Sequence, residues 1–210
     1  MDEILVIDDH STDSTVVESL KAGALVISRN GPRGVGAAIK TGYREGLRRG
    51  GDVFLVLAGD MQHDPAEIPR LLKAIRDGHA DYAVGDRLSG DPLAYGMPPV
   101  RYIGNLFLTF VTRLMTRVDA RDSQCGFTAV TREALERIDM ESLSDSWGIT
   151  NGLLAESRRS HIRVQSVPVT THYGSRASYI RIRSYVPRMV MVLARAFFRT
   201  IRNSQTPCAR

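Results

Sequence analysis

The stretch Ile4-Leu-Val-Ile-Asp-Asp-His-Ser-Thr-Asp13 decides the fold, because an apolar strand runs directly into acidic residues and a helix-capping segment. A cluster of Ser, Thr and Asp before an amphipathic stretch is typical of a helix N-terminus. In open α/β sheets, ligands bind at the carboxyl ends of strands, which is where Asp8 and Asp9 fall. Two adjacent carboxylates are costly to desolvate without a partner, so the stretch predicts a ligand-facing edge of a sheet.

Apolar runs and amphipathic stretches continue to alternate along the chain. They predict strands at 3–8, 24–28, 52–57 and 80–85, and helices at 12–22, 34–49 and 65–78. This βαβα order is typical of an α/β protein with a mostly parallel, doubly wound sheet. Further on, the sequence predicts an irregular loop at 88–99, helices near 100–117, 131–138 and 147–158 with a short strand before the second of them, a strand at 161–167, and a final helix from about 180 to 202.

Composition limits the class of protein. The chain has 210 residues, of which 43% are hydrophobic, so we expect one main domain, with room for an appendage. Its net charge is +5, and its three lysines all precede residue 74, whereas arginines crowd the C-terminal part. This preference for arginine suits the binding of phosphate or an anionic surface, and a high genomic GC content would explain it equally well.

Cysteine use and hydropathy bear on location. The two cysteines indicate no disulfide framework and favour a reducing, cytoplasmic compartment, and Cys125 is expected to be a small buried residue. We find no signal peptide and no apolar run of the ~18 residues that a transmembrane helix requires. We therefore expect a protein that is soluble or lies on a membrane.

Two further motifs leave the same edge of the predicted sheet. Asp60-Met-Gln-His-Asp-Pro65 follows the strand at 52–57, and oxygen ligands at a strand end suit Mg²⁺ or Mn²⁺ held between protein and phosphate. The alternative makes Asp60 a turn residue; we prefer the metal for Asp60 and a helix-start role for Asp64. Asn30-Gly-Pro-Arg-Gly-Val-Gly36 resembles an anion-binding loop, although a turn with close packing explains its glycines about as well.

A strand that ends in two acidic residues is also found in response-regulator receiver domains, which carry a phosphorylated Asp near residue 60. That class needs a lysine at the end of a later strand, and this chain has none after Lys73. The chain is also far longer than such a domain. A receiver-type signalling domain is therefore the weaker hypothesis.

Six motifs, in order and spacing, resemble family 2 glycosyltransferases, above all the polyprenyl-phosphate (dolichol-phosphate) mannosyltransferase branch. They are Asp8-Asp-His-Ser-Thr-Asp13, Asn30-Gly-Pro-Arg-Gly-Val-Gly36, Gly59-Asp-Met-Gln-His-Asp-Pro65, Gly85-Asp-Arg87, Asp122-Ser-Gln-Cys-Gly-Phe127 and Val167-Pro-Val169. The resemblance implies a GT-A nucleotide-diphospho-sugar transferase fold. It also implies an inverting transfer of a hexose from a GDP- or UDP-sugar to a polyprenyl phosphate or a saccharide acceptor, with Mg²⁺ or Mn²⁺ as the cofactor.

The resemblance also implies roles for individual residues. The nucleotide side comprises Asp8, Asp9, Ser11, Asp13, Gly34 and Gly36. Asp60 and Gln62 are implied metal ligands, and His172 is a further candidate, although a lone histidine is more often an ordinary surface or packed residue. Arg87, Arg101 and Asp122 are implied near the transfer point, with Asp122 as the proton acceptor if the acceptor is a hydroxyl.

Departures from the family pattern support a second hypothesis. Ala58 stands where relatives commonly have the first acidic residue of Asp-x-Asp, and the family's usual first strand and Pro-x-x-Asn-Glu loop would precede the sequence given. The alternative function is thus an inactive, truncated relative that binds nucleotide or a membrane. Trp147 is expected to lie in the core.

The C-terminal segment has its own pattern. Between residues 181 and 202, arginines fall on one side of the predicted helix and Val, Met, Leu, Phe and Ile on the other. A basic amphipathic helix of this kind suits a membrane interface, and its alternative is packing on the domain or on a second subunit. We expect a catalytic domain at 1–178, an amphipathic Arg-rich segment at 179–210, peripheral contact with the inner face of the cell membrane, and no nucleic-acid partner.

Overall fold

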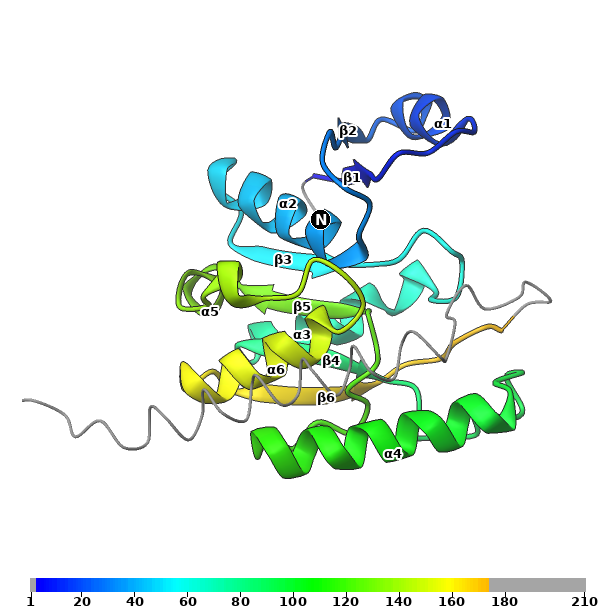
Figure 1. The fold of residues 1–210 in the computed structure, drawn as a ribbon, viewed down its shortest axis with the longest axis vertical. Helices are drawn as coiled ribbons and strands as arrows, with labels where there is room; N and C mark the ends of the chain where they lie inside the picture. The colour runs from blue at the N-terminus through cyan, green and yellow to red at the C-terminus, as the bar shows by residue number, and fades with distance from the viewer. Residues whose placement is uncertain (1–2, 174–210) are drawn as a thin grey trace, which may run out of the picture.

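The computed structural model describes residues 3–173, which form an α/β structure of sheets flanked by helices (Figure 1). The strands are β1 (Leu5–Asp8), β2 (Leu25–Ser28), β3 (Val53–Val56), β4 (Tyr82–Asp86), β5 (Thr128–Thr131) and β6 (Val164–Pro168). The helices are α1 (Thr15–Lys21), α2 (Val35–Arg48), α3 (Ile68–Arg76), α4 (Pro99–Thr116), α5 (Arg132–Glu136) and α6 (Ile149–Arg159), with short 3₁₀ turns η1 (Pro65–Glu67) and η2 (Met140–Ser142). The predicted α/β class is confirmed; the helix predicted at 180–202 and the boundary at 178 lie outside the described residues.

The strands form two separate hydrogen-bonded sheets. β1 and β2 pair in parallel, and the second sheet has the order β3-β5-β4-β6. Here β5 runs antiparallel to both β3 and β4, while β6 is parallel to β4. The sheet is thus mixed rather than mostly parallel, because β5 enters between β3 and β4 from the opposite direction after the long α4 excursion.

A seam separates the two sheets. Within residues 3–173, β1 pairs only with β2, and β3 pairs only with β5. Helix α2 packs against both β1 and β3, and therefore links the two sheets through side chains rather than through a hydrogen-bonded ladder. In Figure 1, β1, β2 and α1 lie at one end of the molecule and α4 at the other.

The core surrounds the four-stranded sheet. β4 is buried along its whole length, as expected for an inner strand that is covered on both faces. Leu71 of α3, Phe127 before β5 and Leu154 of α6 are fully buried against this sheet. Because β4 is buried and paired with a strand on each side, its last residue, Asp86, and the following Arg87 have defined positions in the site.

Candidate active site

The first cluster lies at the end of β1. Asp8 is 7% exposed, and its Oδ1 accepts a hydrogen bond from the backbone N–H of Ser11 at 3.0 Å. Hydrogen bonds from the Ser11 side chain and backbone hold the pKa of Asp8 below its usual value. Ser11 and Asp13 are exposed, and hydrogen bonds from Thr15 lower the pKa of Asp13 in the same way. This end of the strand therefore presents carboxylates that stay ionised, with exposed polar groups beside them.

Asp9 ties this cluster to the glycine-rich loop. One carboxylate oxygen accepts from Arg29, and the other accepts from the N–H of Gly34 at 2.7 Å. Arg33 donates to the His10 carbonyl at 2.5 Å, which adds a second link between the two segments. Asp9 thus fixes the loop that begins α2, and its oxygens already have protein partners.

Close packing explains the two glycines at the start of α2. A Cβ on Gly34 would meet the carbonyl oxygen of Asp145 at 2.2 Å, and one on Gly36 would meet that of Ser144 at 2.1 Å. The N–H of Ala37 donates to the Asp145 carbonyl at 2.9 Å. Of the two explanations open from the sequence, close packing has direct structural support, and a nucleotide-binding role for these glycines stays a prediction.

The second cluster joins the acidic loop after β3 to the segment after β6. The exposed Asp60 accepts a hydrogen bond from the Gln62 N–H at 3.1 Å, around Met61 in a left-handed conformation with φ of 62°. The N–H of His172 donates to the Gln62 carbonyl at 2.9 Å. The structure therefore places the three candidate metal ligands Asp60, Gln62 and His172 on neighbouring segments.

The third cluster is a buried ion pair. Arg87, just past β4, donates from Nε to Asp122 Oδ2 at 2.6 Å and from Nη2 to Oδ1 at 3.0 Å. Asp122 is 0% exposed and also accepts from the Gln124 N–H at 3.0 Å. Burial alone would lower the pKa of Arg87, but the charge of Asp122 raises it well above the usual value. Arg87 is thus a permanent cation held in one orientation.

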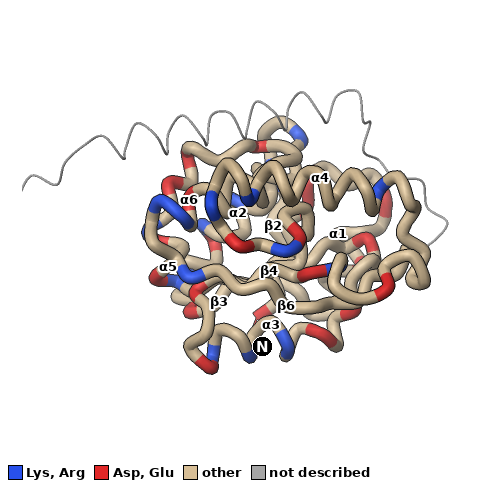
Figure 2. The backbone as a smooth tube through the Cα atoms, turned by 90° about the horizontal axis from the view of Figure 1, so that it is seen from below, with Lys and Arg blue, Asp and Glu red and all other residues tan. Residues whose placement is uncertain are grey.

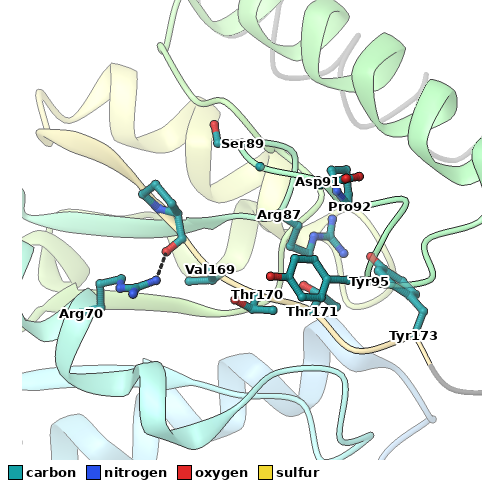
Figure 3. A pocket seen from close by; sticks show the side chains of 12 residues that line it. Arg70, Arg87, Ser89, Asp91, Pro92, Tyr95, Val169, Thr170, Thr171 and Tyr173 are labelled. Atoms are coloured by element: carbon teal, nitrogen blue, oxygen red, sulfur yellow. Dashed lines mark hydrogen bonds between the residues drawn. The ribbon is translucent and has the colours of Figure 1, made fainter.

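Arg101 and Tyr173 extend this third cluster. The Arg101 guanidinium lies over the Tyr173 ring, 4.9 Å from its centroid, which is cation–π geometry. Arg87 and Tyr173 both line a pocket of about 230 Å³, with Arg70, Tyr95 and the backbone after β6 (Figure 3). Figure 3 shows Arg87, Tyr95 and Tyr173 gathered on one side, while Arg70 donates to the Pro168 carbonyl on the other.

His63 connects the second and third clusters. It is 7% exposed, its ring centroid lies 5.1 Å from that of Phe127, and its Nε2 lies 4.0 Å from Cys125 Sγ. Burial, with a contribution from Arg87, lowers its pKa to about 4, while Asp60 and Asp122 act in the opposite direction. The ring is therefore neutral at pH 7 and lies among the charged residues of the site.

Sequence reasoning left His63, Tyr95 and Tyr173 out of the site. His63 stands inside the quoted Gly59–Pro65 motif, which could have identified it, whereas the two tyrosines reach the pocket only through loops without any periodic signal. Trp147 was expected in the core, and this is wrong: it is 44% exposed, because it lies in the turn before α6 rather than on a buried face. Cys125 is buried as expected, and burial raises its pKa to about 12.

Comparison with solved structures identifies the fold class. The chain is similar to glucosyl-3-phosphoglycerate synthase from Mycobacterium tuberculosis in complex with Mn²⁺, uridine diphosphate and glucosyl-3-phosphoglycerate, with a TM-score of 0.70 and 18% identity over 93% of this chain and 69% of that one. At this identity the likeness shows the fold alone, which is that of the GT-A glycosyltransferases.

Sequence comparison then identifies the family. Residues 1–139 match the family described as Glycosyl transferase family 2, and the chain belongs to that family. It is 32% identical to polyprenol monophosphomannose synthase of Mycolicibacterium smegmatis, over 80% of this chain and 65% of that protein. It is also 32% identical to dolichol-phosphate mannosyltransferase of Pyrococcus furiosus, over 83% of this chain and 49% of that protein. The chain thus spans about two thirds and one half of the lengths of these two relatives.

Proposed function

We propose that the protein transfers a hexosyl group, with inversion, from a GDP- or UDP-sugar to a polyprenyl phosphate, using Mg²⁺ or Mn²⁺. A saccharide acceptor is the second possibility. The observation that carries the proposal is the buried, permanently charged Arg87, which Asp122 holds in one orientation and whose charge, like that of the exposed Asp60, acts on His63 beside the Asp60–Gln62 turn. One side of the site thus suits a cation with its diphosphate, and the other suits an anionic acceptor.

The donor side rests on the acidic turn. Asp60 and Gln62 offer two oxygen ligands, and His172 lies on the adjoining segment. The described residues hold no group of three or more His, Cys, Asp or Glu side chains that could cage a metal. Mg²⁺ and Mn²⁺ take a few protein oxygens together with phosphate and water, so the oxygens of Asp60 and Gln62 are ligands of the kind that these ions use. Such a cation neutralises charge that builds up on the departing nucleoside diphosphate.

The nucleoside is assigned to the β1 end, where Asp8, Ser11 and Asp13 lie. Both oxygens of Asp9 already have protein partners, so its part in this proposal is to fix the loop at Gly34. In this proposal Gly34 and Gly36 lie at the edge of the donor site. Their lack of side chains lets the backbone approach the 144–145 segment closely.

The acceptor side rests on Arg87 and Arg101. A phosphate acceptor is already anionic and needs no strong base, and two arginines can orient it and compensate its charge. Asp122 has both oxygens engaged and no exposed surface, so in this proposal it positions Arg87. A hydroxyl acceptor would require a free base, and the geometry of Asp122 therefore favours the phosphate.

The test combines binding and transfer with the full chain. We expect calorimetry to detect Mn²⁺-dependent binding of GDP- or UDP-sugars, and Asp60→Asn to abolish it. Asp52→Asn, an exposed acidic residue before β3, is the matched control and should bind normally. In a transfer assay, Arg87→Lys should lower the rate by about tenfold or more, because lysine cannot reproduce the two-pronged geometry.

A control for the arginine change is Arg163→Lys, which alters a two-pronged pair with Asp81 at the amino-terminal end of β4, opposite the end that Arg87 follows. Binding without transfer to any acceptor would favour the inactive, nucleotide-binding alternative. Unchanged metal-dependent affinity in Asp60→Asn would remove the metal assignment.

Membrane contact is a separate part of the proposal. No helix within residues 3–173 has the length and apolar character needed to cross a bilayer. We propose peripheral binding to the inner face of the cell membrane through the Arg-rich residues 180–202, which lie outside the described residues. Removal of residues 180–210 should release the protein from anionic vesicles, and co-sedimentation at low and high salt measures this.

A further inference from the structure

Helix α4 has an unusual distribution of polar and apolar side chains. Its buried residues are polar, namely Asn105, Thr109, Thr112 and Thr116. Its large apolar residues face outward, with exposed fractions between 43% and 73%: Val100, Ile103, Leu106, Phe107, Phe110 and Leu114. In a helix that only covers a protein core, the two faces would be exchanged.

The inner face of α4 is built to be polar. The Thr112 hydroxyl lies 2.8 Å from the Leu108 carbonyl oxygen and 2.7 Å from Asn151 Oδ1, within hydrogen-bond reach of both, and the Thr109 hydroxyl lies 3.3 Å from that of Ser123. Buried polar groups that are satisfied in this way fix the rotation of the helix about its axis. The outward apolar stripe is therefore a consequence of defined packing.

The stripe is continuous. Its members at 100, 103, 107, 110 and 114 are separated by three or four residues and so lie along one side of the helix. Scattered exposed apolar residues are ordinary, whereas a contiguous stripe with two phenylalanines marks a binding surface. Figure 2 views the molecule from the side on which α4 lies, and Figure 1 places the helix along an outer end.

Charge distinguishes between the possible occupants of this surface. α4 contains no Asp or Glu, and Arg101, Arg113 and Arg117 lie at its two ends, with Asp119 paired to Arg113. The chain has no acidic residue after Glu156, so its own C-terminal segment would bring further arginines to the same surface. A second copy of α4 would likewise bring arginine against arginine. An anionic lipid surface complements both the apolar stripe and its flanking cations.

We propose that the outer face of α4 docks flat on an anionic membrane surface, with Phe107 and Phe110 inserted at the boundary between headgroups and acyl chains. The inference deepens the proposed function, because Arg101 in the first turn of α4 stacks on Tyr173, which lines the pocket beside Arg87. Docking therefore brings the acceptor side of the site to the surface that carries a polyprenyl phosphate.

The test measures vesicle binding of the full chain without donor or acceptor. The variant is Phe107→Ser/Phe110→Ser, and the matched control is Val17→Ser/Leu20→Ser on α1, whose side chains are 51% and 57% exposed. We expect the wild type and the control to co-sediment with phosphatidylcholine/phosphatidylglycerol vesicles, and the α4 variant to bind at least ~10-fold more weakly although its C-terminal arginines are intact. Circular dichroism checks that each variant is folded.

A reporter gives a second, direct measurement. In a Trp147→Phe background, Phe110→Trp should emit at long wavelength in buffer, and its emission should shift to the blue when anionic vesicles are added. A blue-shifted emission without vesicles, or a wild-type dimer that the α4 variant abolishes, would show that protein covers the stripe and would overturn the proposal. Equal vesicle binding by the wild type and the variant would do the same, as would a wild type that never binds.

These outcomes separate the docking surface from the reaction. If the α4 variant loses vesicle binding but transfers sugar to a water-soluble short-chain polyprenyl phosphate, both proposals stand. If the wild type binds vesicles but transfers sugar to no acceptor, the proposed function fails and the docking surface remains.

Discussion

Asp122→Asn should strongly destabilise the folded protein, because it breaks the buried ion pair between Arg87 and Asp122. Asp122→Asn removes the negative charge but leaves a guanidinium whose side chain is 4% exposed. Removing one partner of a buried ion pair costs about 3–5 kcal/mol, because the remaining charge is both desolvated and uncompensated. The amide can keep at most one acceptor for the two N–H groups of Arg87, so we expect a loss near the upper half of that range.

An exposed pair in the same protein gives the reference. Arg163 donates to both oxygens of Asp81, at 3.1 and 2.7 Å, but the arginine side chain is 59% exposed. Because water can replace the lost partner there, Asp81→Asn should cost only about 0.2–1 kcal/mol. The two substitutions are chemically identical and differ mainly in burial.

The assay is urea unfolding of the full chain at pH 7, with midpoints compared among the wild type and both single variants. A third variant, Arg87→Met/Asp122→Leu, removes both charges and should be more stable than Asp122→Asn alone. If Asp122→Asn costs no more than Asp81→Asn, the pair is not desolvated in solution, and the orienting role that we give to Asp122 is refuted.

Other predictions concern packing and titration. Gly36→Ala should destabilise the protein by about 2 kcal/mol or more, because the new Cβ would lie 2.1 Å from the Ser144 carbonyl oxygen. The control is Gly104→Ala, whose Cβ would meet nothing within 4 Å and which should be neutral or slightly stabilising. Thermal unfolding compares the two variants with the wild type. The pKa of His63 is about 4 in the folded protein and ordinarily 6.5, so the side chain takes up a proton on unfolding at any pH between these two values. The stability that neutral His63 contributes is therefore present above pH 6.5 and is lost as the pH falls towards 4. Urea midpoints at pH 7 and 5 should reveal a loss of about 2 kcal/mol that His63→Gln largely removes, and an unchanged loss in that variant would contradict this origin.

The alternation of strands and helices was predictable from local pattern. The elements from β1 to β4 were predicted within a few residues, since apolar runs and glycine-rich turns mark their ends. The position of β5 was not, because nothing in Thr128–Thr131 says that it will enter antiparallel between β3 and β4. Strand order depends on long-range pairing, which periodicity does not encode.

For the candidate site, too, the sequence predicted some residues but not the contacts between them. Motif order led to Asp60, Arg87 and Asp122, but the sequence could not tell that both oxygens of Asp122 are engaged by Arg87. That fact depends on two loops separated by 35 residues meeting in space. The outward stripe of α4 was also hidden, because an apolar helix is ordinarily expected to bury its apolar side chains, and only the packing of Thr109 and Thr112 shows the reverse.

The seam between the two sheets has a consequence for how the molecule opens. α1 buries no residue, and β1 and β2 are joined to the rest mainly through α2. Since no strand ladder within residues 3–173 crosses the seam, β1, α1 and β2 can separate while the β3-β5-β4-β6 sheet stays intact. Native-state hydrogen exchange should therefore record faster exchange of the β1 and β2 amides than of those in β4. A nucleotide that bound at Asp8 and Ser11 would slow that exchange. The exchange rate of the β1 and β2 amides would therefore measure occupancy of the donor site before any sugar is transferred.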